Sequence, residues 1–482
     1  MKKNNLFKIL LIVFISVVFL SWIIPVGIYE NATFTLGQIT PVGIFDLTLI
    51  PLTVFDLALP SIIFILVVGV FYGILNKTGV YSKMISEVST KLKGKEITFL
   101  TIIIIAFGVL SSLVGLNLAF FLIVPFIVAI LFMLGFSKIT TMLATIGSIL
   151  VGSMGSIYGT DISYYLNRYF GHNSDYNYHT SIFPDKIILL ILLLVLLVMF
   201  VLHKGKFDLK TSKRKEEEIP LYEKNDTSKR SWKPLLIIIT MAFIFIIVGS
   251  FKWDDIIGNI DNPTPLLDFY EKIMTTELNG FSIVSGILGN IQPIGYWGLP
   301  FISVFTLFVT LLIIIVYRIK LDEVLDGLSN GIKSVIRLIL YIIGSNLVLA
   351  ILFKNGATSN FVVTIIDYLM NMTENFSSLM LSTATIISSF FYNNFSVLVD
   401  TLYTPTVILT GATVELRFLA SLIIQTLYGL VMFIAPTSVL LITGLAYFDI
   451  SYKEWFKNVW KLLLQILIVI VLIIIIVTIF SM

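Results

Sequence analysis

The sequence predicts an all-α polytopic membrane protein with two inverted-topology repeats, re-entrant hairpins, discontinuous helices and about 11 membrane spans. Three observations lead to this fold class. Of the 482 residues, 57% are hydrophobic and 13% are charged, a composition typical of a chain that lies largely in lipid. Apolar runs of about twenty residues recur along the chain. The apolar stretch at residues 386–447 is interrupted twice by polar residues, and similar interruptions occur nearer the N-terminus.

The apolar runs mark the expected spans, beginning at the N-terminus. The first run is long and lacks a small-residue cleavage site, so it predicts a membrane helix rather than a signal peptide. Residues 97–135 and 376–412 are apolar but broken in the middle, and each is expected to form a re-entrant hairpin with a flanking helix rather than two simple crossings. The uninterrupted spans are expected near residues 6–27, 58–76, 139–160, 184–203, 235–251, 296–316, 335–353, 416–446 and 457–480.

These spans divide the chain into four parts. Residues 1–203 form the first membrane repeat, with its hairpin at 97–135 and a broken helix at 139–160. A charged segment, 204–234, is expected to be a solvated cytoplasmic linker. Residues 235–295 supply an extra span and an external loop. Residues 296–482 form the second, inverted repeat, with its hairpin at 376–412 and a broken helix at 416–446.

An internal similarity supports the repeat. Residues 74–82 and 351–359 are identical at five of nine positions, an offset of 354 − 77 = 277. The same offset places Asn117 on Asn394, and Gly159-Thr160 on Pro436-Thr437. The nonapeptide alone is weak support, but polar breaks that fall on polar breaks at one offset are stronger.

The distribution of lysine and arginine predicts the orientation of the two repeats. Lysines flank the first run at Lys2, Lys3 and Lys8 and cluster after Lys77, so these segments are expected in the cytoplasm. The same bias places Lys354 and the C-terminus outside. Lys77 and Lys354 would then lie on opposite faces of the membrane, and such an arrangement permits alternating access to a site at the membrane midplane.

The polar breaks are the expected substrate site. Pro436 removes a backbone donor and leaves carbonyl groups that need partners, and irregular backbone at membrane depth persists only inside protein or beside a water-filled cavity. Interhelical hydrogen bonding and close packing of small residues are the alternative roles for these side chains. The candidate substrate-binding residues are Asn117, Gly155, Ser156, Thr160, Asp161, Asn393, Asn394, Ser396, Asp400, Pro436, Thr437 and Ser438.

Two of these candidates are carboxylates. Asp161 and Asp400 would suit a substrate amine, a guanidinium group, Na⁺ or a proton, because carboxylates within a membrane are costly and usually functional. Alternatively, they lie in water at helix ends. We expect no lysine or arginine near either break, which favours a cationic or zwitterionic substrate over a dianionic one. A carboxylate substrate would have to rely on helix N-termini and hydroxyl groups.

The composition excludes several other kinds of site. The chain has no cysteine, and its three histidines lie outside the apolar runs, so thiol chemistry and a histidine metal site are not expected. A net charge of +3 gives no reason to expect nucleic acid as a partner. The chain also lacks a Gly-x-x-x-x-Gly-Lys-Ser/Thr phosphate-binding loop. We therefore expect a protein that is not an enzyme and has no cofactor beyond a coupling Na⁺ or H⁺; Na⁺ would bind near Asn117, Asn394 and Thr437.

Two segments carry a resemblance to a known family. Residues 22–29, Trp-Ile-Ile-Pro-Val-Gly-Ile-Tyr, end the first run, and residues 435–438, Ala-Pro-Thr-Ser, precede Gly444-Leu445-Ala446. With these the chain resembles, over nearly its whole length, the YfcC family, which is related to anaerobic C4-dicarboxylate carriers of the DcuC type in the ion-transporter superfamily. The resemblance implies a carrier of small organic solutes in the inner or plasma membrane, and relatives are often homodimers.

The predicted function is therefore secondary active transport, by symport or exchange, through alternating access. The favoured substrate is a basic or zwitterionic amino acid such as arginine or ornithine, and the alternative is a C4-dicarboxylate or another carboxylate. A channel and an intramembrane enzyme are remote alternatives: saturable flux stimulated by solute on the opposite side would exclude the channel, and the enzyme would need clustered catalytic side chains that the chain lacks. The expected partners are the solute, the lipid bilayer and a second copy of the chain.

Overall fold

The computed structural model describes residues 6–481 except 116, 160, 172–177, 212–218, 225–229, 259–261, 263, 279–280, 290 and 412. In this part of the chain eight helices are long and apolar enough to cross a membrane, and shorter apolar helices of 10–17 residues accompany them. The expected all-α polytopic class is confirmed. Discontinuous helices divide into short pieces, so length alone identifies fewer candidate spans than the apolar runs do.

Two short antiparallel hairpins add a little strand to the helical fold. The first joins β1 (Gly27–Glu30) to β2 (Thr33–Leu36), and the second joins β3 (Glu277–Leu278) to β4 (Phe281–Ser282). Both lie in the connections between helices.

The first half of the chain contains the following helices: α1 (Leu6–Leu20), α2 (Ile44–Lys77), α3 (Tyr81–Lys91), α4 (Glu96–Val114), the 3-10 helix η1 (Asn117–Leu122), α5 (Val124–Met133), α6 (Lys138–Met142), the π-helical turn η2 (Leu143–Gly147), α7 (Ser148–Met154), α8 (Ile162–Phe170) and α9 (Tyr178–Thr211). The segment expected as one broken helix at 139–160 is thus a nearly continuous run to Met154, followed by a break and then by α8.

The middle and second half continue with α10 (Lys233–Ser250), α11 (Asp254–Ile257), α12 (Pro265–Thr275), α13 (Ile283–Leu288), α14 (Leu299–Tyr317), α15 (Leu321–Leu352), the 3-10 helix η3 (Phe353–Asn355), α16 (Phe361–Met370), α17 (Ser378–Phe391), α18 (Phe395–Thr410), α19 (Val414–Met432), α20 (Val439–Tyr447) and α21 (Tyr452–Ser481). Here α17 and α18 occupy the expected hairpin at 376–412, and α19 and α20 occupy the expected broken helix.

Helix bounds in the second half follow those in the first half at the offset of 277 residues. Helix α8 begins at 162 and α20 at 439, and α8 ends at 170 and α20 at 447. Helix α2 begins at 44 and α15 at 321. The offset found in one nonapeptide therefore also relates helices on both sides of it.

The equivalent helices α2 and α15 pack against each other in antiparallel directions. A Cβ atom added at Gly73 would lie 2.1 Å from the carbonyl oxygen of Gly327, and one at Gly331 would lie 2.2 Å from that of Gly69. Because only glycine lacks this atom, the two backbones come this close only at glycine. One residue number rises along the contact as the other falls, so the two helices run in opposite directions.

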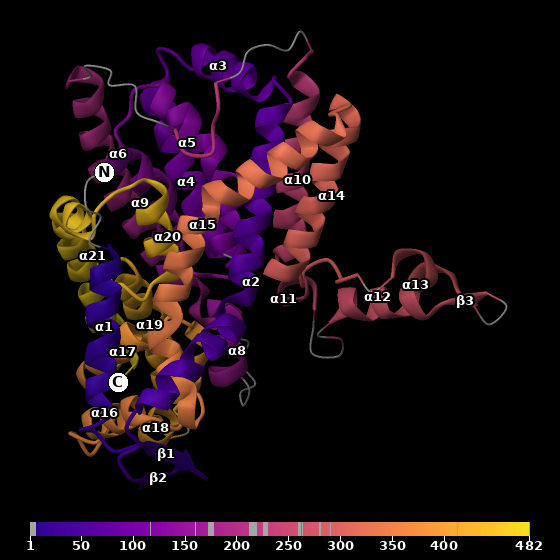
Figure 1. Ribbon diagram of the computed structural model, residues 1–482. Coiled ribbons are helices and arrows are strands. Elements are labelled where there is room, and N and C mark those ends of the chain that lie inside the picture. The colour runs from indigo at the N-terminus through magenta and orange to yellow at the C-terminus, as the bar shows by residue number, and fades with distance from the viewer. Residues whose placement is uncertain are drawn as a thin grey trace.

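Ion pairs join both ends of this helix pair. Lys77 at the end of α2 lies 3.9 Å from Asp326, and Lys354 after α15 lies 2.5 Å from Asp46 in the first turn of α2. Lys77 and Lys354 are thus at opposite ends of the pair. The neighbouring helices follow the same arrangement, with α3 at one end of the molecule and α16 at the other (Figure 1).

The linker expected at 204–234 is less solvated than its charge suggests. Helix α9 continues through Thr211, and the later described part packs against the first half. The side-chain amide of Asn76 donates to the carbonyl oxygen of Leu221 at 3.3 Å and accepts from the Glu223 amide at 3.2 Å. Tyr222 also packs its ring edge-on against Tyr81. Apolar and aromatic residues within the charged segment account for this difference.

Candidate functional site

The first break lies between the end of α7 at Met154 and the start of α8 at Ile162. Its carbonyl groups find partners in other helices. The side-chain amide of Gln425 in α19 donates to the carbonyl oxygens of Met154 and Ser156 at 2.9 and 3.0 Å. The hydroxyl of Ser112 in α4 donates to the carbonyl oxygen of Gly155 at 2.6 Å. These donors replace the water that lipid cannot supply.

The second break, between α19 and α20, is satisfied in the same way. The indole of Trp455 donates to the carbonyl oxygen of Phe433 at 3.0 Å, and the hydroxyl of Tyr452 donates to that of Ile434. The Asn393 side chain donates to the carbonyl oxygen of Thr437 at 3.2 Å. The helix is interrupted around Pro436 without leaving these carbonyl groups unpaired.

The two hairpin tips carry the asparagines expected there. At the first tip, the Asn117 side-chain oxygen accepts from the Ser111 hydroxyl at 2.6 Å. At the second, Asn394 caps α18, because its side-chain oxygen accepts from the backbone amide of Ser396 at 3.0 Å. The Asn393 amide also donates to Asn346 Oδ1 at 3.1 Å and to the Ser345 carbonyl oxygen at 3.2 Å. Asn393 therefore ties this tip to α15 and to the second break.

Between the tips and the breaks lies a cavity of about 290 Å³, close to the lower end of the range for small-molecule sites. The predicted residues Asn117, Asp161, Asn393, Asn394 and Ser438 all line it. The other lining residues are Leu57, Ser61, Gly115, Leu118, Leu150, Ser153, Leu299, Asn346, Leu349, Phe395, Tyr428, Gly429, Met432, Val439 and Leu440.

Three helix N-termini meet at this cavity. Asp161, Asn394 and Ser438 are the residues that immediately precede α8, α18 and α20, and all three line the cavity. A helix N-terminus carries a partial positive charge and unpaired backbone N–H groups, so it favours anions. Asp161 adds a carboxylate on the side of the first break, whereas Ser438 occupies the equivalent position without charge. No lysine or arginine is among the lining residues.

The remaining predicted residues are not among those that line the cavity. The Ser396 hydroxyl donates to the side-chain oxygen of Asn394 at 2.7 Å, and the Thr437 hydroxyl donates to the carbonyl oxygen of Phe390 at 3.0 Å. Gly155, Ser156 and Pro436 are buried, and the first two accept the hydrogen bonds that close the first break. Thr160 falls outside the described residues.

Asp400 is a predicted carboxylate that lies apart from the cavity lining. It lies one and a half turns inside α18 rather than at the tip, it does not line the cavity, and its carboxylate accepts a hydrogen bond from the hydroxyl of Tyr169 in α8 at 2.6 Å. The role of Asp400 in substrate binding therefore stays a prediction that the cavity lining does not support. The carboxylate instead joins α8 to α18.

The expectation that no cation lies near a break is wrong. Lys186 in α9 is only 1% exposed, and its ammonium group donates to the hydroxyl of Ser163 at 3.3 Å. Ser163 in turn donates to the carbonyl oxygen of Ser156 at 3.0 Å. The lysine thus lies beside the first break, although 25 residues separate it from Asp161 (186 − 161). A buried ammonium group in a membrane protein is costly and is commonly functional.

Sequence reasoning also missed polar residues inside otherwise ordinary spans. Gln425 and Asn346 are buried amides within α19 and α15, and Ser153 and Tyr428 line the cavity. The available signal was an amide in the middle of an apolar helix, since such a group requires a partner. The positions of those partners depend on the fold.

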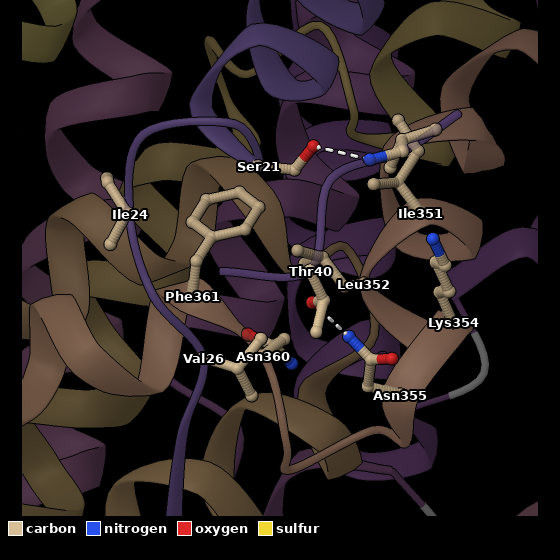
Figure 2. Close-up of a pocket in the computed structure, with 11 residues that line it drawn as sticks. Ser21, Ile24, Val26, Thr40, Ile351, Leu352, Lys354, Asn355, Asn360 and Phe361 are labelled. Atoms are coloured by element: carbon tan, nitrogen blue, oxygen red, sulfur yellow. Dashed lines mark hydrogen bonds between the residues drawn. The ribbon is translucent and has the colours of Figure 1, made fainter. Parts of the chain in front are cut away.

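A second cavity, of about 10 Å³, lies where the chain after α1 meets the end of α15 (Figure 2). Asn355 donates to the Thr40 hydroxyl at 2.6 Å, and the Ser21 hydroxyl accepts from the Val42 amide at 3.1 Å (Figure 2). Its volume suits about one water molecule. We assign these contacts to the attachment of the N-terminal segment, not to a substrate site.

Broken helices and hairpins around a polar cavity, in a chain of many apolar helices, define a membrane transporter. The chain belongs to the DcuC family, the C4-dicarboxylate anaerobic carriers, whose sequence model matches residues 4–479. It is thus a multi-pass membrane carrier for a small-molecule solute. A search of curated protein sequences finds no match.

Two solved structures of transporters are similar over nearly their whole length. The YdaH transporter of Alcanivorax borkumensis is 10% identical with a TM-score of 0.44, and the alignment covers 98% of each chain. MtrF of Neisseria gonorrhoeae, described as one of a class of antimetabolite efflux pumps, is 12% identical with a TM-score of 0.39, covering 97% of this chain and 94% of MtrF.

Proposed function

We propose that this protein carries C4-dicarboxylates across the membrane and binds them in the 290 Å³ cavity. The observation that carries the proposal is that the N-termini of α18 and α20 meet at this cavity with the side chains of Asn393, Asn394 and Ser438. Membership in the DcuC family supports the same substrate class. The carboxylate alternative is thereby better supported than the amino acid that the sequence favoured.

The two carboxylates of the substrate would bind without an arginine. Each helix N-terminus offers backbone N–H groups and a favourable field, about 0.3–1 kcal/mol at exposed positions and up to about 2 kcal/mol when partly buried. The amide of Asn394 adds a neutral donor beside these termini, and Asn393 holds the tip in place. Such weak, divided contacts suit a carrier, which must release its substrate as well as bind it.

Asp161 is the proposed site of the coupling cation. A dianionic substrate and an aspartate carboxylate in one cavity repel each other unless Na⁺ or a proton neutralises the aspartate. Cation binding at Asp161 would therefore raise the affinity for the dicarboxylate, which is the coupling that symport requires. The oxygens of Asn117 and Ser153 line the same cavity and are hard ligands that Na⁺ accepts.

Alternating access is proposed to follow from two inverted repeats. The antiparallel α2–α15 pair would form part of the scaffold, and the hairpins and broken helices would move against it. The positive-inside rule then gives a cytoplasmic N-terminus, an external C-terminus and a location in the cell membrane. The homodimer expected from the resemblance is part of the same proposal.

An uptake assay in proteoliposomes tests the substrate. We expect saturable uptake of radiolabelled succinate that excess fumarate or malate inhibits and that an imposed Na⁺ or proton gradient stimulates. Arginine and ornithine should neither be taken up nor compete. Asp161 and the lack of lysine and arginine in the cavity lining favour a cationic amino acid. Arginine uptake without competition by succinate would support that function and reject the dicarboxylate.

A further inference from the structure

Between α10 and α14 the chain forms a projecting segment of residues 251–298, which we call the lateral arm. It begins and ends at one point, because the backbone amides of Gly295 and Trp297 both donate to the carbonyl oxygen of Gly249, at 2.7 and 3.0 Å. From there α11, α12, β3 and α13 extend sideways from the ends of α10 and α14, away from the other helices (Figure 1).

The lateral arm exposes many apolar side chains. Neither α12 nor α13 contains a buried residue. Phe269 in α12 is 60% exposed and Ile287 in α13 is 75% exposed. Side chains of this size in water are costly when they cluster, and a large exposed cluster marks an interaction surface. The other exposed apolar residues of the arm are Ile256, Ile257, Ile273, Phe281, Ile283, Leu288 and Ile294.

The base of the arm carries the side chains typical of a membrane interface. Trp253, Tyr296 and Trp297 cluster where α10 ends and α14 begins, and tryptophan and tyrosine are enriched at the level of lipid headgroups. Both helices are candidate membrane spans. They also expose apolar side chains, among them Phe245 of α10 and Phe308 of α14, so a surface suited to lipid leads directly to the base of the arm.

We propose that the lateral arm lies on the bilayer at the leaflet where α10 ends, with Phe269 and Ile287 inserted among the lipid headgroups. The arm starts at the interfacial level and extends along it rather than out of it, which is the placement of an interfacial amphipathic segment. Its sequence contains six acidic residues and two lysines. Burial of apolar surface, not attraction to anionic lipid, therefore holds it there.

The absence of cysteine from the chain allows a clean test by single-cysteine labelling. Phe269→Cys and Ile287→Cys are each labelled with bimane in the full-length protein and reconstituted in phosphatidylcholine vesicles. Glu271→Cys is the matched control, since it lies two residues from Phe269 and therefore about 200° around the same helix. Lipid-borne doxyl quencher should quench labels at 269 and 287 at least about twice as strongly as at 271, and aqueous iodide should show the reverse order.

Three results would overturn the proposal. Equal iodide quenching at 269, 287 and 271 would place the arm in water. Protection from both quenchers, with cross-linking between copies at 287, would identify a second copy of the chain as the occupant. A strong increase in lipid quenching on adding phosphatidylglycerol would show attraction to anionic headgroups instead of apolar insertion; we expect no increase.

Discussion

Asp161 and Ser438 occupy equivalent positions, 277 residues apart, and both line the same cavity. Each immediately precedes the short helix after a break, α8 for Asp161 and α20 for Ser438. The two halves of the cavity are therefore built alike but differ in charge. In the proposed mechanism, the cation therefore binds at the half with the carboxylate, and a substrate carboxylate binds at the half without one.

Asp161→Asn should abolish coupling. The neutral side chain no longer needs a cation, so succinate uptake should lose its stimulation by the Na⁺ or proton gradient. Ser438→Asp should lower uptake by about tenfold or more, because it introduces a second carboxylate at the substrate half. Initial rates in proteoliposomes, with and without the gradient, measure both effects. Full gradient stimulation in Asp161→Asn would reject this assignment of the cation site.

Asp400→Asn is the matched control for Asp161. Its amide can still accept the hydrogen bond from the Tyr169 hydroxyl, and it does not line the cavity. We expect gradient-stimulated uptake within about twofold of wild type, with at most a loss of about 1 kcal/mol of stability. If Asp400→Asn lost coupling and Asp161→Asn kept it, Asp400 rather than Asp161 would be the cation site.

Lys186→Met should impair transport. The change removes the donor to Ser163 and with it the only fully buried ammonium group among the described residues, while methionine keeps a similar volume. We expect uptake to fall by about tenfold or more. Lys204→Met is the control, since Lys204 is on the same helix and donates to Asn458 Oδ1 at 2.9 Å away from the break. If Lys186→Met and Lys204→Met took up succinate at equal rates, Lys186 would have a structural role and no specific role in transport.

Asn393→Leu should abolish uptake and lower stability. Its amide serves the carbonyl oxygens of Ser345 and Thr437 and the side chain of Asn346, and leaving buried acceptors unpaired costs about 1–3 kcal/mol each. Thermal unfolding in detergent and succinate uptake measure the two effects. Asn371→Ala, at an exposed turn, should change neither. Normal transport by Asn393→Leu would show that the second tip does not need the hydrogen bonds of the Asn393 amide.

Gly73→Val should destabilise the α2–α15 pair. Its new Cβ would lie 2.1 Å from the carbonyl oxygen of Gly327, so the helices must separate, at a cost of about 1–3 kcal/mol or more. The midpoint of thermal unfolding should fall by several degrees. Gly43→Ala is the control, because its Cβ would meet only Asp46 at 3.5 Å. An unchanged midpoint for Gly73→Val would mean that this close approach is absent in solution.

Local polarity in an apolar chain made the breaks predictable. Pro436 and the pair Asn393-Asn394 cannot continue a lipid-exposed helix, and helices end and begin on either side of these residues. The offset of 277 residues also related the two halves before any contact was known. Helix breaks depend on the residues at the break itself, so they can be predicted from the sequence.

Contacts between distant segments were not predictable in the same way. Lys186 reaches the first break only because α9 packs beside α7. Its position in a long apolar run did not indicate which residue its ammonium group would contact. Asp400 was proposed as a substrate-binding carboxylate because it follows Asn394 closely, yet the intervening residues of α18 carry it away from the cavity. The substrate preference changed because the residues near the breaks did not show which helix N-termini meet at the cavity, and because the chain belongs to the DcuC family.

The central claim is that two oppositely oriented halves enclose the cavity, and sided labelling tests it most directly. Lys95→Cys and Met372→Cys replace equivalent positions, 372 − 95 = 277, in the exposed connections that follow α3 and α16. In sealed right-side-out vesicles, a membrane-impermeant maleimide should label 372 at once and 95 only after permeabilisation. Labelling of both cysteines from the same side would contradict the inverted arrangement and, with it, the proposed transport mechanism.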